Sequence, residues 1–146
     1  MYTGKDIVFR VRPQIENDQL NRLHAEGFEH HVVDHDWQPQ LEHSLLWIGA
    51  FHEDRLVGFV NVAWDGGVHA FMLDTAVAIE YRHRGIGTRL VREAIEATKR
   101  HGGLEWMHVD SDEALMKKFY EPAGFEPVHA GTVNVAEPPS DIASSG

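Results

Sequence analysis

The sequence predicts an α/β fold with a mixed sheet, and three observations carry that prediction. Short runs rich in Val, Ile, Leu and Phe recur between turn residues, which is typical of strands. One such run, 70–79, leads through a glycine loop into a helical pattern. The length of 146 residues suits a single core. We therefore expect one domain over residues 1–136 and a flexible tail over 137–146, which has no apolar period.

In the first half of the chain, the pattern predicts a strand, a helix, a loop, a short helix and a hairpin. Apolar and basic residues alternate up to Pro13, which favours a strand near a sheet edge. Asn17 is a suitable N-cap for the helix and Gly27 a suitable stop. The expected bounds, in order, are 7–11, 17–27, 28–37, 39–44, 45–51 and 56–63.

In the second half, the run 70–79 is apolar on both faces, so we expect this strand at the centre of the sheet. After Gly87, apolar residues repeat at helical spacing until Gly102. Acidic residues that can cap a helix precede a second short helical pattern, which Pro122 stops. The remaining expected elements are a strand at 104–109, a helix at 113–120 and a last strand at 125–135.

The composition excludes several classes of function. Without cysteine there are no disulfides, thiolate metal sites or cysteine nucleophiles. No apolar run is long enough to span a membrane, and the N-terminus lacks a signal-peptide pattern, so we expect a soluble, cytoplasmic protein. A net charge of -10 opposes general binding to nucleic acid.

The charges are unevenly distributed along the chain. Residues 14–54 hold many acids and a single Lys or Arg, Arg22, whereas residues 82–100 hold six basic residues and two acids. Both segments can be read as ordinary solvated faces. The functional alternative is an acidic surface that attracts a cationic substrate and a basic segment that faces an anion.

The strongest local signal is R-H-R-G-I-G-T at 82–88, between the predicted buried strand and a helix start. Glycine lets a ligand approach the backbone, and the free N–H groups of a first helical turn favour an anion such as phosphate. The loop lacks the lysine of a Walker A loop and the third glycine of a dinucleotide fingerprint. A tight turn without a ligand remains the alternative for the loop alone.

In its context, the loop resembles the pyrophosphate loop of the GNAT acetyltransferase superfamily, Gln/Arg-x-x-Gly-x-Gly/Ala. The segment K-F-Y-E-P-A-G-F at 118–125 is similar to the late Tyr-x-x-x-Gly-Phe signature of the same family. The resemblance covers roughly residues 7–135. It implies an α/β GNAT fold with a splayed mixed sheet of six to seven strands, flanked by about four helices.

The resemblance also implies acetyl-coenzyme A (acetyl-CoA) as co-substrate and direct transfer to an amine in a ternary complex. Tyr120 matches the tyrosine that donates a proton to the coenzyme A sulfur; a packed aromatic is the alternative reading. Pantetheine would pair with the strand edge at Val77, and a backbone N–H there would stabilise the oxyanion. The loop residues implied to hold the pyrophosphate are Arg82, Arg84, Gly85, Ile86, Gly87 and Thr88.

The general base is where this sequence departs from the family. Leu73 stands where many members have a glutamate. Asp74 is the nearest carboxylate, but strand alternation points it away from the face of Leu73 unless a bulge intervenes; it could also be a structural acid. Ser111 could act on the amine through water. Glu113 replaces a frequent asparagine, which puts that pantetheine contact in doubt.

The loop at 28–37 invites a metal reading, because His30, His31 and His35 lie close to carboxylates in the sequence. The composition of this stretch does not support the helix that would align them. We expect no metal and an acidic, solvated loop that helps to select the acceptor.

The sequence therefore predicts an N-acetyltransferase that acts on a small, cationic primary amine. A protein or peptide amine as acceptor, or a catalytically silent acyl-CoA sensor, are the alternatives. We expect no nucleic-acid partner and no membrane partner; a homodimer is possible.

Overall fold

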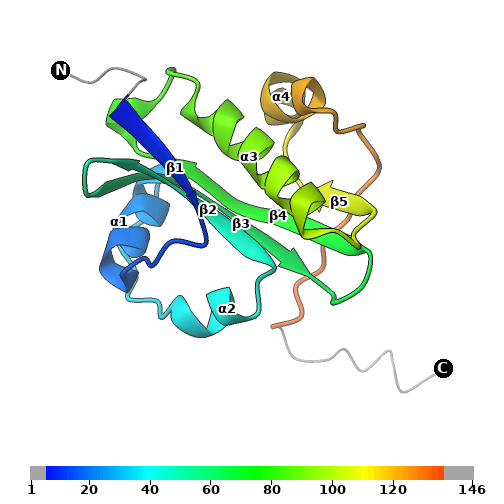
Figure 1. Ribbon diagram of the computed structural model, residues 1–146, viewed down its shortest axis with the longest axis horizontal. Coiled ribbons are helices and arrows are strands. Elements are labelled where there is room, and N and C mark those ends of the chain that lie inside the picture. The colour runs from blue at the N-terminus through cyan, green and yellow to red at the C-terminus, as the bar shows by residue number, and fades with distance from the viewer. Residues whose placement is uncertain (1–5, 137–146) are drawn as a thin grey trace.

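The computed structural model describes residues 6–136 and contains a five-stranded sheet in the order β1-β2-β3-β4-β5 (Figure 1). All neighbouring strands are antiparallel except β4 and β5, which are parallel. The expectation of six to seven strands is therefore wrong for this part of the chain. The strands are β1 (Ile7–Val11), β2 (Leu46–His52), β3 (Arg55–Trp64), β4 (His69–Val77) and β5 (Trp106–Val109).

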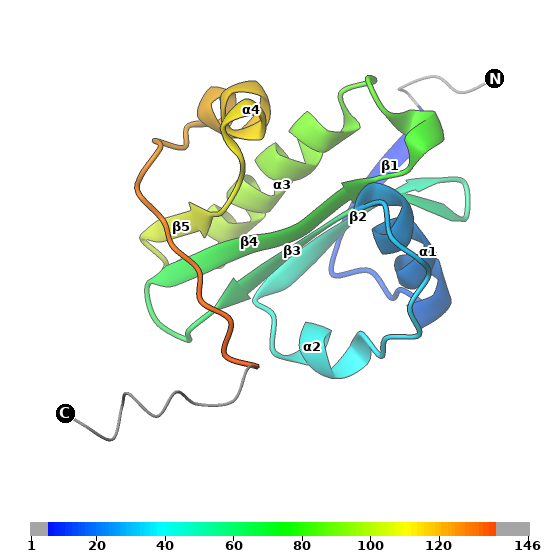
Figure 2. The same ribbon diagram turned by 180° about the vertical axis from the view of Figure 1, so that it is seen from behind.

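Helices cover both faces of the sheet. Figures 1 and 2 show α1 and α2 on one face and α3 and α4 on the other. In α3, Leu90, Val91 and Ala94 lie on one side and are fully buried, as the helical spacing predicted. The bounds are α1 (Asn17–Gly27), α2 (Gln38–Glu42), α3 (Ile86–His101) and α4 (Glu113–Leu115), which continues as a π-helical turn (Met116–Tyr120) and a 3₁₀ turn (Glu121–Ala123).

β3, and not β4, is the central strand, which corrects the expectation from the sequence. Val57, Phe59, Val60 and Val62 are completely buried between the two helical layers. β4 is apolar but mixed in burial, with Phe71 and Leu73 exposed. The apolar run at 70–79 therefore belongs mainly to the strand next to the most buried one.

The expected last strand at 125–135 is absent. Residues 125–136 follow the 3₁₀ turn without regular structure, and Val128, Val133 and Val135 are exposed. Figure 2 shows this segment passing β5 and β4 toward the side of α2. The β-branched composition favoured a strand, but no hydrogen-bonded partner strand is present among residues 6–136. The tail predicted at 137–146 lies outside the described residues.

β4 contains a β-bulge at the point that matters for the site. Phe59 pairs with Ala76 and Asn61 with Leu73, so three steps along β4 match two along β3. Asp74, within this bulge, has a left-handed backbone with φ of 57°. The extra residue changes which face each side chain takes, and the simple alternation assumed from the sequence fails here.

Candidate active site

The glycine loop forms a tight turn directly before α3. Gly85 is the N-cap residue and has φ of 81°, a conformation that glycine adopts without strain. The first N–H groups of an α-helix have no intrahelical acceptor, so those of Ile86, Gly87 and Thr88 are available to an anion. A Cβ at Gly87 would meet atoms at 3.5 Å and beyond, from Phe119 and Val77. These features fit a pyrophosphate group.

Two arginines in this region are engaged with the protein itself. The guanidinium of Arg82 donates to the carbonyl oxygens of Val77 (3.4 Å) and Glu26 (3.2 Å). Arg89 stacks on Phe9 with 4.1 Å from its guanidinium carbon to the ring centroid. Arg82 therefore connects the loop to the end of α1, a role that the sequence did not suggest.

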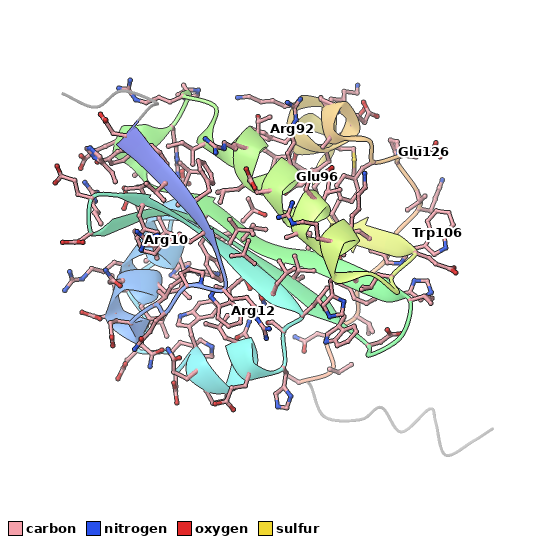
Figure 3. All side chains as sticks on the ribbon, in the orientation of Figure 1. Arg10, Arg12, Arg92, Glu96, Trp106 and Glu126 are labelled. Atoms are coloured by element: carbon pink, nitrogen blue, oxygen red, sulfur yellow. The ribbon has the colours of Figure 1, made fainter. Side chains whose placement is uncertain are left out.

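Part of the basic segment is simply the solvent face of a helix. Arg92 and Glu96 lie along α3, as Figure 3 shows, and both are exposed. Lys99 forms an exposed ion pair with Glu96 at 3.5 Å. This part of the basic segment is therefore an ordinary solvated face.

The sheet opens between β4 and β5. β5 pairs only with His69 to Met72, where Met72 lies opposite Val109. β4 continues to Val77 without a β5 partner, so its backbone edge is open beside the N-terminus of α3. An open strand edge can accept the amide groups of an extended ligand. This opening is the splay that the family resemblance implies.

Tyr120 lies at this opening on the α3 face of the sheet. Its side chain is 8% exposed, hydrogen-bonds to Thr75 of β4 and packs edge-on against Phe125. Burial is the main cause that raises the pKa of the phenol; Asp112 raises it further, while the Thr75 hydrogen bond lowers it. The phenol therefore stays protonated and able to donate over a wide pH range.

The opposite face of β4 carries a different group of side chains. Asp74 Oδ1 lies 3.1 Å from Nε2 of His24 on α1, and Nδ1 of His24 lies 2.8 Å from Nε2 of His30. The side chains of His24 and Asp74 are about one-quarter exposed, at 24% and 25%. Because of the bulge, Asp74 is on the same face as Leu73, which corrects the alternation argument. His24 lies outside every motif in the sequence.

These side chains line a cavity of about 320 Å³ between α1, β4 and the loop 28–37. Two asparagines of α1 hold the loop in place. Asn21 accepts from the Trp37 indole N–H at 2.7 Å and donates to the His35 carbonyl at 3.0 Å, while Asn17 accepts from the Trp37 backbone N–H at 3.0 Å. The cavity is lined by Asn21, His24, His30, Val33, His35, Trp37, Gln40 and Asp74.

Asn61 adds an unusual acceptor on the same face of the sheet. Its side chain is 1% exposed and stands opposite Leu73, next to the bulge. Its Oδ1 atom has no hydrogen-bond partner among the described residues. A buried carbonyl without a donor is costly, so water or a bound donor group is favoured there.

Ser111 and Glu113 lie apart from these two groups. Ser111 donates to the carbonyl oxygen of Asp112 at 2.9 Å and lines a larger cavity of about 940 Å³ between α3, β5 and the segment after α4. Glu113 is exposed and pairs with Lys117 at 3.2 Å. The structure therefore brings Tyr120 and Asp74 to the two faces of one strand but gives Ser111 a different cavity. Trp106 and Glu126 mark the outer edge near that cavity (Figure 3).

The histidines of the loop have protein partners. His30 contacts His24 and the His31 carbonyl oxygen, and His35 contacts Oε1 of Gln40 at 3.1 Å. Within residues 6–136 no three His, Asp or Glu side chains are placed to hold a metal ion. No helix in that range is long and apolar enough to cross a membrane.

Comparison with known proteins agrees with this geometry. The model of the family described as Acetyltransferase (GNAT) family matches residues 13–125. The chain belongs to this family. Mycothiol acetyltransferase of Nocardia farcinica (strain IFM 10152) is 43% identical in an alignment of 88 residues that covers 52% of this chain. The match spans 28% of the length of that relative.

Solved GNAT structures share the fold. A GNAT-family acetyltransferase of Streptococcus pneumoniae TIGR4 superposes with a TM-score of 0.71 at 22% identity, over 88% of this chain and 98% of that chain. A putative acetyltransferase of Deinococcus radiodurans R1 gives 0.70 at 22%, over 92% of both chains. An aminoglycoside acetyltransferase from an uncultured soil metagenomic sample, in complex with sisomicin, gives 0.67 at 20%, over 90% and 97%.

Proposed function

We propose that this chain transfers the acetyl group of acetyl-CoA to the primary amine of a small cationic molecule, directly, in a ternary complex. The observation that carries the proposal is the opening between β4 and β5. It has free helical N–H groups at one end, a buried phenol on one face and a carboxylate on the other.

The loop and the open strand edge suit the co-substrate. The N–H groups of Ile86, Gly87 and Thr88 would bind the pyrophosphate, and the edge of β4 near Val77 would hold pantetheine. Arg84 would add positive charge from within the loop. Arg82 would act indirectly, because it fixes the loop through Val77 and Glu26.

Acetyl transfer requires a neutral amine, a stabilised oxyanion and a proton for the leaving thiolate. Tyr120 would donate that proton, since its raised pKa keeps the phenol protonated. A backbone N–H at the end of β4 would stabilise the oxyanion. Asp74 would accept a proton from the ammonium form of the amine, in the role that Leu73 cannot fill. Ser111 lines the other cavity, so its catalytic role has no support from contacts with these groups.

The acidic character of the acceptor side favours a cationic molecule. Asp74 lines the 320 Å³ cavity, Asn61 presents a buried acceptor nearby, and Glu29, Asp34 and Asp36 are exposed on the loop beside it. An ammonium group has three donors and no acceptor, so such a surface complements it. The volume suits a small molecule better than a folded protein segment.

Isothermal titration with acetyl-CoA tests the cofactor site. Wild-type protein should bind with micromolar affinity, and Gly87→Trp should lose binding, because the indole would fill the space in front of the α3 N–H groups. Gly67→Trp is the matched control, since it places the same side chain in the turn before the far end of β4. Absence of binding by folded wild-type protein would refute the proposal and favour a domain without a ligand.

A second titration separates the enzyme from a silent sensor. Thiol release from acetyl-CoA with spermidine, putrescine or butylamine should rise with amine concentration for an enzyme. Binding of acetyl-CoA without release for any amine or lysine-containing peptide would favour the sensor. Release only with the peptide would favour a peptide acceptor.

A further inference from the structure

We infer that His24 and His30 form a proton relay that carries the proton of the acceptor ammonium from Asp74 to solvent. The inference rests on the proposed function; it assigns a role to His24, which no motif marks, and gives His30 a role other than metal binding. Asp74 would face the amine, whereas His24 and His30 act through it as positioning and proton-transfer residues.

The three side chains form a continuous chain of hydrogen bonds. Asp74 Oδ1 and His24 Nε2 are 3.1 Å apart, and His24 Nδ1 and His30 Nε2 are 2.8 Å apart. Nδ1 of His30 is in hydrogen-bond contact with the His31 carbonyl oxygen. Phe28 stacks on the His24 ring at a centroid distance of 4.4 Å and holds that ring in its orientation.

The end of this chain fixes its polarity. A carbonyl oxygen only accepts, so Nδ1 of His30 carries a hydrogen. If His30 is neutral, its Nε2 then accepts from Nδ1–H of His24. A neutral His24 would present a bare Nε2 to the Asp74 carboxylate, which places two acceptors 3.1 Å apart. The contact between His24 and Asp74 is attractive only when the three hydrogen-bonded side chains hold one further proton.

That proton has three alternative positions. When the proton is on Asp74, the carboxyl O–H donates to Nε2 of His24. When it is on His24, the imidazolium donates to both neighbours. When it is on His30, both His30 nitrogens donate, and Nε2–H of His24 donates to Asp74. The proton moves among the three groups while every heavy atom stays in place. This is the property that a relay requires.

The chain leads from the cavity to solvent. Asp74 and His24 are about three-quarters buried, whereas His30 is exposed. The proton would leave when Nδ1–H of doubly protonated His30 exchanges its contact with the His31 carbonyl for water and donates to that water. The titratable groups that line the cavity around His24 are Asp74 from β4, and His30 and His35 from the loop. His35 contacts Gln40 and is outside the hydrogen-bonded chain.

The stoichiometry of the proposed reaction leaves one proton to remove. The amine enters as an ammonium with three hydrogens on nitrogen. Its nitrogen forms the new bond to the acetyl carbon as the carbon–sulfur bond breaks and the electron pair goes to sulfur. One hydrogen stays on the amide, one ends on the thiol through Tyr120, and one leaves as a proton. The relay removes that last proton before attack, which frees the nitrogen lone pair.

Imidazole NMR of the ¹⁵N-labelled protein tests the relay without any acceptor. His30 should be in the Nδ1–H form, and both rings should change together in one pH transition. In Asp74→Asn, the amide can donate to Nε2 of His24, which satisfies the chain without the extra proton and moves the transition to lower pH. His31→Gln keeps the backbone carbonyl and should leave the transition in place. Independent titration of His24 and His30, unchanged by Asp74→Asn, would overturn the relay.

Steady-state kinetics with spermidine as the probe amine tests its function. His24→Gln and His30→Gln should each lower kcat at least tenfold with an unchanged KM for acetyl-CoA. The acidic limb of the pH profile should move to higher pH, since the amine must then arrive already neutral. His31→Gln should match wild type.

The two proposals fail in different ways. If wild type releases thiol and both relay variants keep its kcat and pH profile, the relay is overturned and the acetyltransferase stands. If wild type neither binds acetyl-CoA nor releases thiol, the proposed function fails, and the NMR result alone decides whether the shared proton exists.

Discussion

The two faces of β4 differ in how they handle a proton. On the α3 face, Tyr120 is 8% exposed, and burial holds its proton in place. On the α1 face, Asp74 and His24 are partly open and connect to an exposed histidine. In the proposed mechanism, β4 therefore separates the phenol that would donate a proton from the side chains that would pass a proton to water. One bulge in β4 creates this separation.

The bulge is what makes Asp74 a candidate for the role that Leu73 cannot fill. The extra residue brings Asp74 onto the α1 face, beside His24, while Thr75 remains on the face of Tyr120. Adjacent residues of one strand therefore face opposite sides: Asp74 is the proposed base, and Thr75 contacts the proposed acid, Tyr120. The following predictions test this difference between the two faces.

Deletion of Thr75 should have the largest effect. It removes the extra residue, restores regular pairing of β4 with β3 and turns Asp74 away from His24. Loss of the proposed base should lower kcat by about a hundredfold or more. Thiol-release kinetics measures this change, and circular dichroism checks that the sheet is retained. Near-normal kcat in a folded deletion variant would contradict the role given to the bulge.

Tyr120→Phe tests the opposite face and should rank second. The aromatic packing against Phe125 is kept while the hydroxyl is lost. We expect kcat to fall by about ten- to a hundredfold, with unchanged affinity for acetyl-CoA by calorimetry. Full activity in this variant would show that Tyr120 is only a packed aromatic.

Replacing Gly27 and Gly87 by alanine compares how closely the end of α1 and the start of α3 are packed. At Gly27, at the end of α1, a Cβ would lie 2.7 Å from Cβ of Ala76, and neither atom can move without its backbone. Gly27→Ala should therefore reduce the free energy of unfolding by about 1–3 kcal/mol. At Gly87 the nearest contact is 3.5 Å, so Gly87→Ala should cause no loss. Urea unfolding of both variants measures the difference.

Thr75→Val should have the smallest effect, about 1 kcal/mol of stability. It also removes the hydrogen bond that lowers the pKa of Tyr120, so the phenol should ionise at still higher pH. The pKa of Tyr120 in the folded protein is already raised above the usual value of about 10. The stability that comes from keeping this phenol protonated is therefore complete below that pH. It is lost as the pH rises through the folded-state pKa. Ultraviolet titration of tyrosinate, with Tyr120→Phe to assign the signal, checks whether the phenol ionises at higher pH in Thr75→Val than in wild type.

Much of the fold and of the glycine loop could be predicted from the sequence. The strand, glycine loop and helix around Gly85 obey local rules of period and backbone conformation, and the structure has β4 and α3 there. The hairpin of β2 and β3 and the short helix near Pro39 were also predicted within a few residues. These features depend on neighbours in sequence, which a single chain reveals.

The acceptor side could not be predicted, because it depends on long-range contacts. His24 and Asp74 are 50 residues apart, and the bulge that joins them leaves no mark in the pattern of β4. Asn17 and Asn21 looked like ordinary polar helix residues, yet they anchor the loop 28–37. The prediction of a strand at 125–135 is wrong for a similar reason, since β propensity without a partner strand does not form a sheet.

Arg82 makes the two ends of the site mechanically dependent on each other. Its guanidinium binds the carbonyl of Glu26, and the Glu26 carboxylate accepts from the N–H of Ile79 at 2.6 Å. The last turn of α1 is thereby fastened to both sides of the junction between β4 and the glycine loop. Arg82 therefore joins the glycine loop to the end of α1. His24 lies two residues before Glu26, so we expect a ligand that displaces the loop to displace His24 as well.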